Sequence, residues 1–185
     1  TPHHYLCYAL QPGYQRGGTS HNSHGFRGPE ISTPKPAGVF RIVITGGSTT
    51  YGEFIEDDAD TFPAKLQTIL RTLTGNDAIE VVNGGVPGYC SWESLGNLAF
   101  RLLEFEPDLV IPYEGVNDVH ARLVSPNAYR SDNAGRRTIW TEPVEVRICK
   151  HSVLARILGH HLGLWRLPGV DSYVQAPTSD PGTHT

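Results

Sequence analysis

Short apolar runs alternate with amphipathic stretches between residues 39 and 113 of the chain. The run Val39–Thr45 is rich in β-branched residues and predicts a buried strand. Two further runs, Glu80–Asn83 and Asp108–Tyr113, predict a second and a third strand. Pro112 weakens the prediction near the end of the third strand, because proline cannot donate to a β-ladder.

Helical periodicity separates these three runs. Residues 62–73 place their apolar side chains on one helical face, with Thr61 as a candidate N-cap and Gly75 as a stop signal. A second amphipathic stretch begins at the candidate cap Ser91 and runs to about Phe105. The order strand, helix, strand, helix, strand predicts an α/β fold of parallel βαβ units with right-handed crossovers.

The two ends of the chain have a different character. Residues 1–38 hold six glycines and five prolines with little periodicity, which predicts an irregular arm that wraps the domain. Residues 151–165 carry leucine, isoleucine and tryptophan at helical spacing and predict a packed helix. The tail after Pro168 is rich in Pro, Gly, Ser and Thr and is expected to be a loop.

Composition narrows the function classes. The chain has 185 residues, 38% hydrophobic and 18% charged, as expected of one globular domain. A net charge of −4 argues against a nucleic-acid partner, and no apolar stretch is long enough to cross a bilayer. The chain contains no methionine and starts at Thr1, so we expect a processed, trimmed or partial chain. Cys7, Cys90 and Cys149 lack metal-ligand spacing and are interpreted as small buried residues.

Each predicted strand ends in a polar loop that contains glycine. The first loop holds Gly46, Gly47 and Ser48, the second covers residues 83–88, and the third covers residues 115–118. The carboxyl ends of parallel strands lie along one edge of a sheet, where open α/β folds place their sites. A hydroxyl, a glycine N–H and a carboxamide meeting there are the parts that acyl transfer requires.

These loops resemble the sequence blocks of the SGNH (GDSL-type) hydrolase family. Residues 46–52 resemble the first block with Ser48 as nucleophile, residues 82–88 the second with Gly88, and residues 115–118 the third with Asn117. The resemblance implies that the Ser48 and Gly88 N–H groups and the Asn117 side chain form the oxyanion hole. Asn22 with Gly25-Phe26-Arg27-Gly28 also resembles a lead-in found in an often exported or membrane-anchored bacterial branch.

The same resemblance implies a three-layer, flavodoxin-like parallel sheet with helices on both faces, expected to be incomplete at the C-terminus. Residues 1–38 are then the arm, and residues 39–185 are a partial SGNH hydrolase-like domain. The implied function is a serine esterase or acyl-hydrolase acting on an ester or an acylated carbohydrate or lipid. No cofactor or metal is implied, and an extracytoplasmic location is expected.

The sequence departs from the family pattern in two respects. Gly47 stands where many members have aspartate, although a glycine at this place resembles a variant found within the family. The family's late Asp-x-x-His block, which supplies the base, does not occur; Asp180 to His184 is one residue too long. The base could lie beyond Thr185, come from Asp180 and His184 in a distorted block, or be lost. Loss of the base would leave a non-catalytic, SGNH-like binding or structural subunit of a larger, perhaps membrane-associated, assembly.

Other polar groups have plainer interpretations. The acidic cluster of residues 56–60 is interpreted as a solvated loop, and the histidines form no convincing metal set. The glycines fit neither a Walker-type phosphate loop nor the dinucleotide-binding spacing. Asp118 is expected to order its loop rather than to react.

Overall fold

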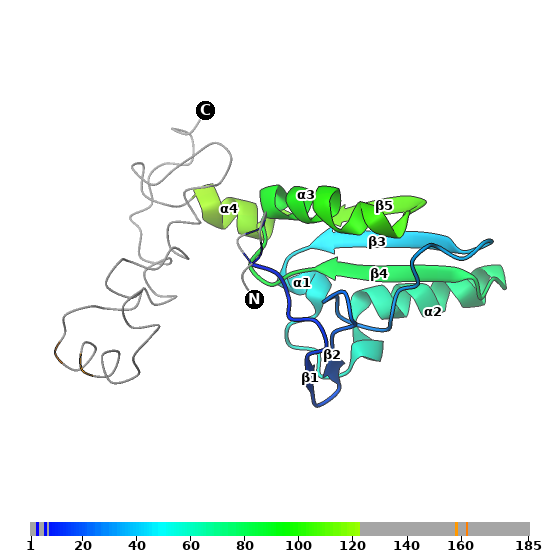
Figure 1. The fold of residues 1–185 in the computed structure, drawn as a ribbon, viewed down its shortest axis with the longest axis horizontal. Helices are drawn as coiled ribbons and strands as arrows, with labels where there is room; N and C mark the ends of the chain where they lie inside the picture. Colours follow the sequence, from blue (N-terminus) through cyan, green and yellow to red (C-terminus); the bar gives the residue numbers. More distant parts are fainter. Residues whose placement is uncertain (1–2, 4–5, 7, 123–157, 159–161, 163–185) are drawn as a thin grey trace. The chain divides into compact units, whose positions relative to one another are not determined.

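Three parallel strands form the central sheet of the computed structural model (Figure 1), which describes residues 3, 6, 8–122, 158 and 162. The strands are β3 (Phe40–Gly46), β4 (Ile79–Gly85) and β5 (Leu109–Tyr113), in the order β4-β3-β5. The register pairs Gly46 with both Gly85 and Tyr113, so all three strands end at the same level. The three predicted strands are confirmed, and β5 continues through Pro112.

The predicted helices are also present. Helix α2 (Phe62–Thr74) begins after the N-cap Thr61 and ends at Gly75, whose φ of 65° is left-handed. Helix α3 (Ser91–Phe100) is shorter than predicted, and a 3-10 turn, η2 (Leu102–Phe105), follows it. Cys90, rather than the predicted Ser91, is the N-cap of α3.

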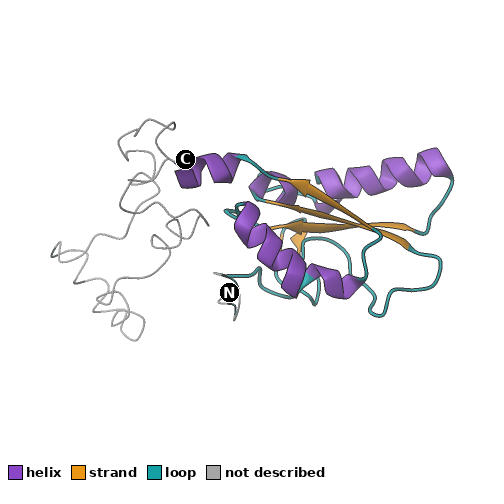
Figure 2. Ribbon diagram, turned by 90° about the horizontal axis from the view of Figure 1, so that it is seen from above, coloured by secondary structure: helices purple, strands orange, loops and turns teal. Residues whose placement is uncertain are grey.

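The sheet is covered on both faces, as Figure 2 shows, with α2 and α3 on opposite sides. Alternate residues of β3 point to different cores because successive side chains of a strand face opposite ways. Ile42 and Ile44 pack in one cluster with Leu66 and Leu70 of α2. Val43 packs in another, which includes Leu102 and Phe105 of η2 and, from the arm, Phe26 and Ile31. The sheet therefore has one apolar cluster on each of its two faces.

The arm is more ordered than its composition predicts. It contains a short antiparallel pair, β1 (Gln15–Arg16) and β2 (Thr19–Ser20). Asn22 closes a turn, because its Oδ1 accepts the N–H groups of His24 and Phe26 at 3.1 and 3.0 Å. Phe26, only 1% exposed, therefore enters the core from the arm.

The chain divides into two units, Thr1–Asp118 and Val119–Thr185. Helix α4 (Val116–Arg122) spans the boundary between them. The predicted helix at residues 151–165 lies outside the described residues except for 158 and 162, where the Leu162 N–H donates to the Leu158 carbonyl at 2.8 Å. Within the described part of the chain, no helix is both long enough and apolar enough to span a membrane.

Candidate active site

Ser48 begins a four-residue helix, α1 (Ser48–Tyr51), directly after β3. Gly46 and Gly47 make the turn from strand to helix, and Gly52 ends α1 with a left-handed φ of 81°. The Ser48 side chain is half-buried at the carboxyl edge of the sheet. This is the placement that the sequence predicts for the hydroxyl.

Gly47 lies in close contact with the other two strand-end loops. A Cβ atom added to Gly47 would lie 2.6 Å from Asn117 Nδ2 and 3.2 Å from the Tyr89 carbonyl oxygen. The first distance is shorter than real Cβ contacts, so a side chain at position 47 would displace the Asn117 amide. The loops after β3, β4 and β5 therefore meet at one point, next to Ser48.

Gly88 occupies the third position of a tight turn. The Tyr89 N–H donates to the Val86 carbonyl at 3.1 Å, and Gly88 has a φ of 84°. With Pro87 in the second position, these values define a type II turn. The Val86 N–H donates to the Gly46 carbonyl at 2.9 Å, which joins this turn to the end of β3. Among the described residues, the N–H groups of Ser48 and Gly88 have no hydrogen-bond acceptor.

Asn117 is held toward the same point. Its Nδ2 donates to the Tyr89 carbonyl at 2.7 Å, which uses one of the two amide hydrogens and leaves the other. Asp118 accepts from the backbone N–H of Ser91 at 3.1 Å and from its hydroxyl at 2.5 Å. Asp118 thus ties the first turn of α4 to the start of α3, a structural contact of the kind that the sequence predicts.

No base contacts the Ser48 hydroxyl among the described residues. Asp180 and His184 lie outside the described residues, and so does the His120 side chain. The buried histidine near α1, His21, is engaged elsewhere. Its Nδ1 donates to the Gln11 carbonyl at 2.9 Å, so its Nε2 accepts from the Tyr51 hydroxyl at 2.9 Å. Burial lowers the pKa of His21 below its ordinary value of 6.5, which favours this neutral form.

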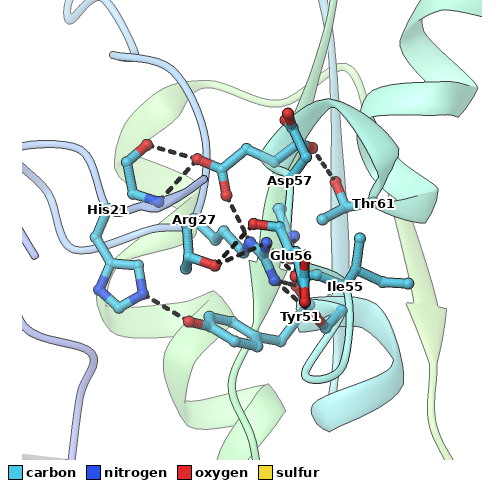
Figure 3. Close-up of polar contacts among 12 residues, drawn as sticks. His21, Arg27, Tyr51, Ile55, Glu56, Asp57 and Thr61 are labelled. Carbon is cyan, nitrogen blue, oxygen red and sulfur yellow. Dashed lines mark hydrogen bonds and ion pairs between the residues drawn. The ribbon is translucent and has the colours of Figure 1, made fainter. Parts of the chain in front are cut away.

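Arg27 of the arm fixes the loop that follows α1, a contact that the sequence does not reveal (Figure 3). Its side chain is 1% exposed and donates to the carbonyls of Gly52 at 2.6 Å and Ile55 at 2.7 Å. Nε pairs with Asp58 Oδ1 at 2.6 Å, and Oδ2 of Asp58 accepts from the Ser20 N–H at 2.8 Å. The prediction that the acidic cluster is a solvated loop is therefore wrong for Asp58, since Arg27 and Ser20 of the arm engage its carboxylate.

Glu114 is a second residue that sequence reasoning misses. It lies two residues before α4, the helix that carries Asn117, and burial raises the pKa of its carboxyl, with the nearby Asp118 charge adding to the shift. Burial thereby favours the neutral carboxyl of Glu114.

The described residues contain no group of three or more His, Cys, Asp or Glu side chains that could hold a metal ion. Cys90 is fully buried, as predicted, and its thiol donates to Glu93 Oε2 at 2.6 Å, while Cys7 and Cys149 lie outside the described residues.

No protein-family model and no curated protein matches the chain. Among solved structures, the chain is similar to AlinE4, an SGNH-hydrolase family esterase, with 28% identity over 58% of each chain and a TM-score of 0.41. An aspartate-to-alanine variant of AlinE4 is 30% identical over 54% of this chain and 52% of its own, with a TM-score of 0.41. A serine-to-alanine variant of AlinE4 is 28% identical over 54% of this chain and 52% of its own, with a TM-score of 0.39. The chain thus spans a little over half the length of these esterases.

The described part of the chain is an α/β structure with a three-stranded parallel sheet and flanking helices.

Proposed function

We propose that this chain carries the nucleophile and the oxyanion donors of an SGNH-type serine esterase or acyl-hydrolase. The observation that carries the proposal is the contact of Gly47 with Asn117 and the Tyr89 carbonyl. This contact brings a half-buried serine, a type II turn glycine and a carboxamide to one edge of the sheet. The proposal also draws on the resemblance of these three loops to the SGNH sequence blocks.

In the proposed reaction, Ser48 Oγ attacks the carbonyl carbon of an ester. Its proton passes to a base, and the carbonyl oxygen becomes an oxyanion. The Ser48 and Gly88 N–H groups and the second amide hydrogen of Asn117 donate to that oxyanion, which is the largest single contribution in such reactions. The tetrahedral intermediate then expels the alcohol, which takes the proton, and water hydrolyses the acyl-serine.

The base is proposed to be a histidine oriented by an aspartate. In the family that the sequence resembles, both come from a late block. Asp180 and His184 are the only residues of this chain that approximate that block. Substituting His184 therefore asks whether they act: His184→Ala abolishes ester hydrolysis if His184 is the base and leaves the rate unchanged if the base lies elsewhere.

The direct test compares the unsubstituted chain with Ser48→Ala in hydrolysis of p-nitrophenyl acetate. The expected result is a loss of at least about 1,000-fold in kcat/KM, because removal of the nucleophile leaves only binding and the oxyanion donors. Mass spectrometry after fluorophosphonate treatment should find one label, on Ser48. Equal turnover by both proteins, together with no label on Ser48, would reject the proposal.

A second candidate function is a non-catalytic binding or structural subunit with the same fold, in a larger assembly. The observation that favours it is that no described base contacts Ser48. Under this alternative, neither ester turnover nor fluorophosphonate labelling depends on Ser48, so the same experiment separates the two candidates.

A further inference from the structure

The peptide group between Pro87 and Gly88 carries one of the proposed oxyanion donors. Type I and type II turns differ mainly by a flip of this central peptide, which exchanges the directions of its C=O and N–H. Glycine in the third position tolerates either arrangement, since it populates both signs of φ. The turn itself therefore leaves the direction of the Gly88 N–H to be decided by other contacts.

A tyrosine of the arm supplies such a contact. The Tyr8 hydroxyl donates to the Pro87 carbonyl oxygen across 79 residues of sequence. In a planar trans peptide the C=O and N–H point in opposite directions. A Pro87 carbonyl bound by Tyr8 therefore directs the Gly88 N–H away from the Tyr8 hydroxyl.

Tyr8 is itself held in place. Its ring packs edge-on against Tyr89, with centroids 5.2 Å apart, and its own backbone carbonyl accepts the Tyr89 hydroxyl. Tyr89 is fully buried, and Leu6 of the arm and Val86 join it in one apolar cluster. The same Tyr89 accepts Asn117 Nδ2 at its carbonyl. Tyr8 thus contacts the residues on both sides of Gly88.

We propose that Tyr8 is a positioning residue for the oxyanion hole. It holds the Pro87–Gly88 peptide in the type II arrangement, so that the Gly88 N–H donates to the developing oxyanion. Its hydrogen bond to Pro87 also polarises the peptide, because bonded amide groups strengthen one another as donors. The proposal rests on the esterase function proposed above and assigns a role in it to the arm.

The kinetic test uses Tyr8→Phe, which keeps the ring and removes only the hydroxyl. The matched control is Tyr14→Phe, which removes the hydroxyl of another arm tyrosine. For Tyr8→Phe we expect kcat for p-nitrophenyl acetate to fall about tenfold with KM unchanged, since the loss concerns an interaction made in the transition state. Tyr14→Phe should keep kcat within about twofold. Equal kcat values for the two variants would overturn the proposal, and so would a change in KM alone.

A second readout does not depend on activity. In the type II turn the Pro87 Hα lies close to the Gly88 amide hydrogen, whereas a flipped peptide separates them. Nuclear Overhauser measurements on the labelled full chain should show this contact strongly in the unsubstituted protein and weakened in Tyr8→Phe. An unchanged contact in Tyr8→Phe would overturn the positioning role. Failure of the esterase proposal looks different: the unsubstituted chain then lacks Ser48-dependent turnover while the turn measurement still decides whether Tyr8 sets the peptide.

Discussion

Gly47 shows at the scale of one residue how close packing favours glycine. Asn117 Nδ2 and the Tyr89 carbonyl oxygen both lie close to the position that a Cβ atom would occupy. A side chain at this position would therefore displace the Asn117 amide and shift the Tyr89 backbone by a few tenths of an ångström.

Gly47→Ala tests this packing. The added Cβ would displace the Asn117 amide or the Tyr89 backbone, and a small misplacement of a donor costs much of its transition-state stabilisation. We expect at least about a tenfold loss in kcat for p-nitrophenyl acetate. Thr49→Ala, at an exposed position in the adjoining helix α1, is the control and should keep its activity. Normal turnover by Gly47→Ala would mean that the contact of the three loops has no part in the reaction.

At the scale of elements, the strands and helices were predictable because their signals are local. The β-branched run that marks β3 consists of neighbouring residues. The apolar face that marks α2 consists of residues three or four positions apart, and Gly75 follows at the end of the helix. Two of the partners of Arg27 were not predictable, because they are backbone carbonyls 25 and 28 residues away. Carbonyl groups leave no trace in side-chain patterns. The predicted end of α3 was wrong because the apolar spacing continues through η2. There the chain forms a 3-10 turn instead of continuing the α-helix.

The contact between the arm and the loop after α1 should be a large contribution to stability. Arg27→Met removes the donor to Asp58 Oδ1 and to the carbonyls of Gly52 and Ile55, while Ser20 still donates to Asp58 Oδ2. Removing one partner of a buried ion pair typically costs 3–5 kcal/mol, and we expect about 3 kcal/mol, since the Asp58 side chain is 19% exposed. Urea denaturation followed by circular dichroism measures the loss.

The matched control for this prediction is Lys65→Met. It breaks a pair with Asp60 whose side chains are 58% and 62% exposed, so the change should stay below about 1 kcal/mol. Similar losses in the two variants would show that burial of the Arg27 pair adds nothing to its strength.

At the scale of the molecule, the arm is part of the domain rather than an appendage. It contributes Phe26 and Ile31 to the core on one face of the sheet and Leu6 to the cluster beneath the Gly88 turn. Arg27 joins it to the loop after α1, and Tyr8 joins it to Pro87. The arm therefore belongs to the same compact unit as the sheet, Thr1–Asp118. Within residues 1–118, the core and the candidate site therefore both depend on the arm.

Deletion of residues 1–31 tests this dependence. Three large buried apolar side chains, Leu6, Phe26 and Ile31, are lost, each worth about 1.5–3 kcal/mol, or roughly 5–9 kcal/mol together. That is comparable with the whole stability of a typical domain, about 5–15 kcal/mol. The shortened chain should therefore lose its near-ultraviolet circular dichroism and bind a hydrophobic dye. Phe54→Ala, at a side chain 93% exposed, is the control and should change the unfolding free energy by less than about 0.5 kcal/mol. Cooperative unfolding of the deletion variant at the midpoint of the full chain would contradict the structural role of the arm.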